Sequence, residues 1–221
     1  MEERMTLCNM AIEAGGKNGI IEADDVTMDY VRQRTDAPYK IYKSDDDAGY
    51  FFKKKYNASE MEPIVAKPHS PDNKAKVSDC VDVRLDRAYI GSCTGGKLTD
   101  FIAAARLLKG KKVKIDTFIV PATREVEQDL HKEKIGNETL VDIFKNAGAY
   151  LGDPSCAACL GGPKDTFGRA ADNQVVVSTT NRNFPGRMGS KQSHVYLASP
   201  YTAAASALTG HITNPAEFIY N

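Results

Sequence analysis

The second half of the chain alternates between short apolar stretches and longer stretches with helical spacing. Runs rich in Val and Ile are typical of strands, and apolar residues three or four apart are typical of helices. This alternation predicts an α/β layer fold with a mainly parallel sheet. The predicted strands are Arg87–Gly91, Val113–Pro121 and Val175–Thr179, and the predicted helices are Leu98–Leu108, Arg124–Lys132, Thr139–Asn146 and Thr202–Thr209.

The first part of the chain is less regular. One helix is predicted over Thr6–Glu13, where two glycines end it, and a second is predicted near Val26–Arg34. Residues 36–60 are charged and rich in Tyr, and the basic run Lys53–Lys55 is interpreted as a solvated helix face because acidic residues surround it. Residues 61–80 contain prolines and little periodicity, which predicts a linker or an irregular crossing segment.

Composition and charge argue against some classes of partner and indicate the kind of compartment. The chain has 29 basic and 29 acidic residues and a formal net charge of zero, which argues against nucleic acid or an anionic membrane as a partner. No apolar run approaches the roughly 20 residues of a membrane-spanning helix. The first residues have neither signal-peptide nor transit-peptide character. Five cysteines in a chain too large to need disulfides indicate a reducing, soluble compartment with thiol or metal chemistry.

Three of the cysteines are candidates for such chemistry. Cys156 and Cys159 form a CxxC pair among small residues, and Cys93 follows the first predicted strand at a Gly-rich helix start, where a thiolate is favoured electrostatically. A redox dithiol, a zinc half-site and a group of packed structural thiols all remain open. Three thiolates also suit an iron–sulfur cluster with one open iron, which acts as a Lewis acid. Cys8 and Cys80 are interpreted as small buried residues.

Polar residues in two other places are weaker candidates. Arg182 and Arg187 lie on a Pro- and Gly-containing loop after the last predicted strand, beside Asn181. Paired guanidinium groups suit carboxylates or phosphates, although surface ion pairing is an equally open interpretation. Asn9 and Glu13 lie four residues apart on the first predicted helix, a spacing that is ordinary for surface residues.

Six segments carry motifs that are more specific in combination than any one of them alone. They span almost the whole chain, and together they resemble the aconitase superfamily, most closely the isopropylmalate isomerase large subunits of plants and algae. The segments are MTLCNMAIEAGG at 5–16, KPHSPDN at 67–73, GSCTGG at 91–96, PSCAACLGG at 154–162, STTNRNFPGR at 178–187 and ASPYTAAA at 198–205.

The resemblance implies a chemistry and a site. It implies a 4Fe-4S cluster held by Cys93, Cys156 and Cys159, with an open iron that binds the substrate. The implied reaction is that of a hydro-lyase of leucine biosynthesis, which converts 2-isopropylmalate to 3-isopropylmalate by removing and returning water. A homoaconitase or aconitase type of hydro-lyase and a non-catalytic remnant that binds a partner are the alternatives. The remaining implied site residues are Arg182, Arg187 and Asn181 for the substrate carboxylates, and Asn9 and Glu13 near the reacting group.

The resemblance also implies an incomplete enzyme. We expect an aconitase-like three-layer αβα fold whose first domain is missing, with residues 1–60 from the second domain, 61–80 as a linker and 81–221 as a third domain carrying the cysteines. The expected partners are the N-terminal part of the large subunit and the small, swivelling subunit. Without them the chain is expected to be inactive or nearly so. Its plant-like motifs suggest the plastid stroma, with the cytoplasm as the alternative.

Overall fold

The structure is a computed structural model, and it describes residues 1–219. The chain forms two compact units, Met1–Met61 and Glu62–Asn221. Within residues 1–219, no helix combines the length and the apolar character that are required to cross a bilayer.

The first unit consists of short helices joined by extended chain. Helix α1 (Glu2–Met10) continues into the 3₁₀ helix η1 (Ala11–Ala14), and α2 (Asp25–Arg32) and η2 (Ala58–Glu60) follow. Asp24 caps α2 by accepting a hydrogen bond from the Thr27 amide, and its carboxylate forms an ion pair with Arg4 at 2.7 Å. This pair lowers the pKa of Asp24 chiefly through the hydrogen bond from Arg4.

The basic run in the first unit does not lie on a helix. Residues 36–57 form no helix or strand, and Lys53–Lys55 lie in exposed extended chain, so the interpretation as a helix face was wrong. An amphipathic helix in a protein is stabilised mainly by the packing of its apolar face. This stretch has no apolar stripe of helical period, and Pro38 and Gly49 further oppose a helix.

The second unit is built on a seven-stranded sheet of order β2-β1-β9-β8-β3-β4-β7. The five strands from β9 to β7 pair in parallel, and β1 and β2 extend the sheet in antiparallel fashion. The mainly parallel α/β fold predicted from the sequence is confirmed. The strands are β1 (Ile64–Ala66), β2 (Lys74–Lys76), β3 (Arg87–Gly91), β4 (Asp116–Val120), β7 (Tyr150–Leu151), β8 (Val175–Ser178) and β9 (His194–Leu197), and a separate hairpin joins β5 (Lys134–Ile135) to β6 (Glu138–Thr139).

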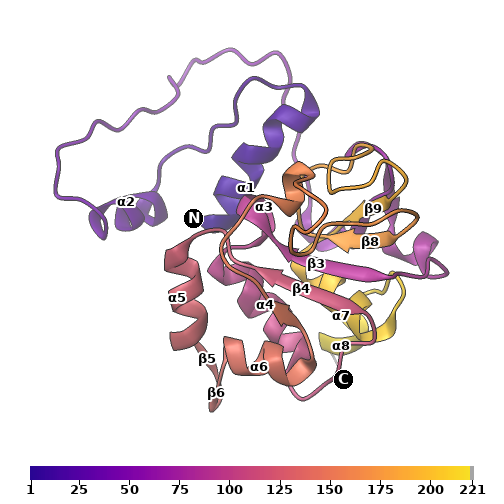
Figure 1. Cartoon of the computed structure of the whole chain (residues 1–221). Coiled ribbons are helices and arrows are strands. Elements are labelled where there is room, and N and C mark those ends of the chain that lie inside the picture. Colours follow the sequence, from indigo (N-terminus) through magenta and orange to yellow (C-terminus); the bar gives the residue numbers. More distant parts are fainter. Residues whose placement is uncertain (220–221) are drawn as a thin grey trace. The chain divides into compact units, whose positions relative to one another are not determined.

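Helices cover one face of this sheet (Figure 1). Their apolar residues share a core with alternate residues of the central strands, such as Ala88, Ile90 and Val177. The four helices predicted in this unit are confirmed, with shifts of one or two residues at some ends. They are α4 (Leu98–Leu108), α5 (Arg124–Lys132), α6 (Leu140–Ala147) and α7 (Pro200–Thr209), and the shorter elements of the unit are η3 (Val77–Cys80), α3 (Ser92–Gly95), η4 (Ala158–Leu160) and α8 (Ala216–Ile219).

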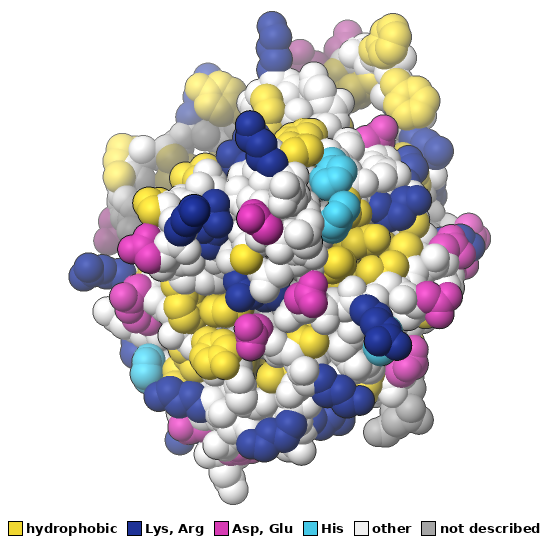
Figure 2. Space-filling view, turned by 45° about the vertical axis from the view of Figure 1, so that its right-hand side comes forward, with side chains coloured by type: hydrophobic (Ala, Val, Ile, Leu, Met, Phe, Trp, Pro, Cys, Tyr) yellow, Lys and Arg dark blue, Asp and Glu magenta, His cyan; other side chains and the backbone are white. Residues whose placement is uncertain are grey.

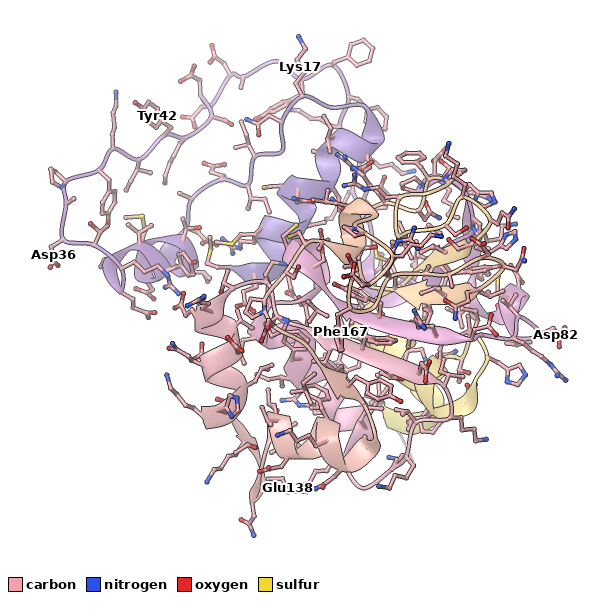
Figure 3. The ribbon with its side chains drawn as sticks, in the orientation of Figure 1. Lys17, Asp36, Tyr42, Asp82, Glu138 and Phe167 are labelled. Carbon is pink, nitrogen blue, oxygen red and sulfur yellow. The ribbon has the colours of Figure 1, made fainter. Side chains whose placement is uncertain are left out.

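Loops rather than long helices cover the opposite face. A second, smaller core joins Tyr89, Val176 and Val195 of the sheet to Ala158 and Met188 of two loops. These are the orange loops of Figure 1, and Figure 3 shows the labelled Phe167 lying over the strands. The Phe167 ring meets that of Phe118 edge to face, with their centroids 5.0 Å apart. The loop layer therefore brings the segment with Cys156 and Cys159 against the sheet.

Most of the segment expected to be a linker belongs to the sheet. Residues 62–80 form β1, β2 and η3, and Val65 and Val77 are buried. The prolines that suggested an irregular segment lie outside the two short strands, at positions 63, 68 and 71. The strand β1 joins the sheet by antiparallel pairing with β9, whose residues lie more than 100 positions later in the chain. Such pairing cannot be predicted from a local sequence pattern.

Candidate functional site

Cys93 lies on a tight turn after β3. Ser92 is fully buried and has a positive φ of 76°, a backbone conformation that is strained for a side chain other than glycine. The single-turn helix α3 begins there and leaves the Cys93 thiol exposed. Strain of this kind persists only where the surroundings hold it, so the turn is a fixed feature of the fold.

Thr179, which follows β8, holds this turn. Its Oγ1 accepts a hydrogen bond from the Gly91 amide at 2.9 Å and lies 3.0 Å from the Gly95 carbonyl, to which it can donate. The Thr179 amide in turn donates to the Tyr89 carbonyl at 3.0 Å. The buried hydroxyl therefore ties both ends of the cysteine turn to the neighbouring strand.

Replacing Thr179 by Val should destabilise the second unit by about 1–3 kcal/mol, because the buried Gly91 amide loses its acceptor while the side chain keeps its shape. The loss is measured as the free energy of unfolding in urea, with unfolding monitored by circular dichroism. Thr179→Ser keeps the hydroxyl and should lose less. Equal stability of Thr179→Val and the parent chain would mean that the hydroxyl does not hold the turn.

The CxxC pair lies on a compact loop. The Ala157 amide donates to Ser155 Oγ at 3.0 Å, and the Gly162 amide closes the loop onto the Ala157 carbonyl at 2.9 Å. Cys156 is exposed and Cys159 is buried. Gly161 has a φ of 68°, and a Cβ there would lie 2.6 Å from the Gly186 carbonyl oxygen, so only glycine allows this approach of the two loops.

The third loop brings Asn181 and Arg187 to the same place. The Asn181 side-chain oxygen lies 3.9 Å from the sulfur of Cys159, and Arg187 is close enough for its charge to act on that thiol. Burial raises the pKa of Cys159, while a hydrogen bond from Ser92 and the charge of Arg187 partly oppose this. The same thiol is thus next to the strained turn of the first cysteine and to the arginine loop.

Tyr89, a residue that the sequence did not single out, lies within electrostatic range of all three cysteines. Its side chain is fully buried on the loop-covered face of the sheet. Burial raises its pKa most, and the charges of Cys159, Cys156 and Cys93 raise it further. All three thiols are therefore within electrostatic range of one hydroxyl, although Cys93 is more than 60 positions from the CxxC pair in sequence.

The three cysteines supply the kind of donor that iron–sulfur clusters use, since such clusters are held by Cys thiolates. Among residues 1–219, no three His, Cys, Asp or Glu side chains converge closely enough to hold one metal ion. The thiolates of a cluster bind different irons, so they need not approach one another as the ligands of one ion do. Two buried donors at this place, Tyr89 Oη and Arg187 Nε, have no hydrogen-bond partner in the described part of the chain. Buried polar atoms without partners indicate a group that belongs there.

The other predicted residues lie in different surroundings. Arg182 is half-buried on the same loop as Asn181. Asn183 is buried and donates to the carbonyls of Lys67 and Val195, so it anchors the loop to the sheet. Asn9 on α1 and Glu13 on η1 belong to the first unit, and their part in a site stays a prediction.

Charge on the surface agrees with a neutral chain. On the face in Figure 2, basic and acidic side chains are interspersed, and neither sign dominates a broad area. This distribution gives no support to a nucleic-acid surface on that face.

Comparison with known proteins decides the family. A family model described as "Aconitase family (aconitate hydratase)" matches residues 1–84 and 79–210. The chain belongs to the aconitase family. The resemblance found in the sequence is therefore confirmed.

Relatives within the aconitase family carry a more specific name. The chain is 56% identical to the "3-isopropylmalate dehydratase large subunit, chloroplastic" of Arabidopsis thaliana, over 99% of this chain and 44% of that protein. It is 48% identical to the large subunit of Heliobacterium modesticaldum and 45% identical to large subunit 1 of Pyrococcus abyssi, covering 98% and 99% of this chain and 50% and 51% of those proteins. The chain spans about half the length of the curated relatives it matches.

Proposed function

We propose that this chain is the cluster-carrying part of a 3-isopropylmalate dehydratase large subunit, a hydro-lyase that acts in leucine biosynthesis. The observation that carries the proposal is the placement of Cys93, Cys156 and Cys159 within range of the buried Tyr89 hydroxyl. The names of relatives that are 45–56% identical support the choice of reaction.

The three cysteines would hold a 4Fe-4S cluster. When bound, such a cluster supplies a Lewis-acidic iron that takes up the negative charge developing on the departing hydroxide. The chain contributes fixed geometry, because the strained turn at Ser92 and the glycine contact at Gly161 leave the cysteine loops few alternative positions. Ser92 contributes a hydroxyl whose hydrogen bond to Cys159 partly opposes the rise in the pKa of that thiol.

Arg182, Arg187 and Asn181 are proposed to bind the substrate. 2-Isopropylmalate carries two carboxylates and a hydroxyl group, and an arginine binds a carboxylate through parallel N–H donors. Arg187 supports this role, because its Nε is buried without a partner in the described residues and its charge reaches the Cys159 thiol. A carboxylate bound at Arg187 would therefore lie beside the cysteines.

Asn9 and Glu13 are proposed to complete the chemistry of the site. A carboxyl group at Glu13 can give a proton to the departing hydroxide and take one back from the returning water, as a general acid and base. Asn9, one helical turn earlier, would supply a hydrogen-bonding amide.

Two further parts are proposed to complete the enzyme. One is the remainder of a large subunit, because the relatives are about twice as long as the matched region. The other is a small subunit, which the term "large subunit" in the relatives' names implies. The relative from Arabidopsis is named as chloroplastic, which supports the plastid as the proposed compartment. By itself the chain should be inactive or nearly so.

The test begins with anaerobic reconstitution of the chain with iron and sulfide. We expect a brown protein with broad visible absorption and about four irons per chain. Mixed with the remaining large-subunit residues and a small subunit, the brown protein should interconvert 2- and 3-isopropylmalate. A preference for homoaconitate or citrate would place it with the alternative hydro-lyases. A colourless chain that takes up zinc or no metal would support the non-catalytic remnant instead.

A further inference from the structure

Tyr89 is held rigidly on the loop-covered face of the sheet. It lies at the centre of β3, where its backbone pairs with Phe118 of β4 and Ser178 of β8. Its ring fits so closely against the loop that a Cβ on Gly168 would come within 2.8 Å of two of its carbon atoms. Gly168 follows Phe167, which Figure 3 shows over the sheet. The ring therefore packs directly against the backbone of Gly168.

The hydroxyl of Tyr89 is a buried donor without an acceptor. The residue has 0% relative exposure, and Tyr89 Oη makes no hydrogen bond to any described residue. Buried tyrosine hydroxyls usually find a partner, because an unsatisfied polar group in the interior lowers stability. The fold thus retains an unsatisfied hydroxyl in its interior. This indicates that a group outside the described residues accepts its hydrogen bond.

The surroundings of the hydroxyl are sulfur-rich. The thiols of Cys93, Cys156 and Cys159 all act electrostatically on it, and each opposes its ionisation. Ala158, between the two loop cysteines, packs in the same core as the ring. A phenol hydroxyl close to three cysteine sulfurs is suited to donate a hydrogen bond toward negatively charged sulfur.

We propose that Tyr89 donates a hydrogen bond from its hydroxyl to a sulfur of the iron–sulfur cluster and thereby makes the cluster harder to oxidise. This inference rests on the proposed function, since it requires the cluster. Hydrogen bonds to cluster sulfurs are among the factors that set cluster reduction potentials. A donor stabilises the more negatively charged, more reduced state, so it raises the reduction potential and slows loss of the cluster to dioxygen.

Tyr89→Phe tests the hydrogen bond while keeping the ring that fills the core. With a cluster reconstituted anaerobically in the 221-residue chain, the variant should have a lower midpoint potential in a mediated redox titration. Its visible absorption should also bleach faster in air. Without iron, the variant should melt at the same temperature as the parent chain or higher, because the hydroxyl it loses has no partner there.

Tyr196→Phe is the matched control. Tyr196 is a partly buried tyrosine on β9 that packs on the helix-covered side of the sheet, and burial also raises its pKa. Its loss should leave both the potential and the bleaching rate unchanged. The two substitutions thus remove the same chemical group from opposite faces of one sheet.

The outcomes separate this inference from the proposed function. A parent chain that binds a cluster while Tyr89→Phe keeps the same potential and bleaching rate would overturn the role of Tyr89 alone. A parent chain that binds no cluster would overturn both proposals. A lower melting temperature of the iron-free Tyr89→Phe chain would mean that the hydroxyl already has a protein partner, which would also overturn the inference.

Discussion

Replacing any one of Cys93, Cys156 and Cys159 by Ser should reduce the iron retained after anaerobic reconstitution from about four atoms per chain to well below one. The cluster would keep only two thiolate ligands, and a serine hydroxyl is not ionised at neutral pH as a ligating thiol is. The loss is measured by iron and sulfide analysis together with the visible spectrum of the desalted protein. This is the largest effect expected from a single substitution in the chain.

The other two cysteines provide the controls. Cys8 belongs to α1 in the first unit, and Cys80 is buried on η3 beside Lys67 and Asp79. Cys8→Ser and Cys80→Ala should therefore retain the full iron content. Iron loss in these controls equal to that of Cys93→Ser would indicate general unfolding or nonspecific iron binding, and the assignment of the three ligands would fail.

Replacing Gly95 by Ala should destabilise the second unit by about 2 kcal/mol. Helix propensity alone predicts the opposite, since Ala is favoured over Gly within a helix by about 1 kcal/mol. A Cβ at Gly95, however, would overlap the backbone oxygen and the side chain of Thr179. Overpacking of this kind typically costs about 1–3 kcal/mol, and here backbone rather than a flexible side chain must move.

The measurement for Gly95→Ala is the free energy of unfolding in urea. Gly49→Ala is the control, because a Cβ at Gly49 has no neighbouring atom within 4 Å and its φ is not in the positive region. We expect the control to stay within about 0.5 kcal/mol of the parent chain. If Gly95→Ala were as stable as the control, the close contact between the cysteine turn and Thr179 would not be a constraint on the site.

Helices and the central strands could be predicted from the sequence because their signals are local. Leu98–Leu108 and Arg124–Lys132 were predicted with the bounds that α4 and α5 have. The helix α6 begins one residue after the predicted start because Thr139 is its cap, accepting a hydrogen bond from the Asp142 amide at 3.1 Å. Caps and apolar periodicity are properties of neighbouring residues, so a single sequence carries them.

Strands that depend on distant partners were missed. β9 lies between β8 and β1 in the sheet, and β1 pairs with it through Ala66 and Leu197. The strand His194–Leu197 lacks the run of Val residues that marks β8, and its stability comes from the neighbours that flank it. The helical interpretation of Lys53–Lys55 was wrong because a charged stretch without an apolar face has nothing to pack, and packing is what mainly stabilises a helix in a protein.

The sequence by itself determined the family, the fold class and the three candidate cysteines, because these follow from motifs and periodicity along the chain. Only the tertiary structure decided that Tyr89 and Thr179 belong beside those cysteines. Tyr89 looks like an ordinary strand residue in sequence, and nothing distinguishes Thr179 from its neighbours within the STTNRNFPGR segment. Their importance arises from tertiary contacts. The Thr179 hydroxyl accepts a hydrogen bond from the amide of Gly91, and the buried Tyr89 hydroxyl lies within electrostatic range of the three thiols without a partner among the described residues.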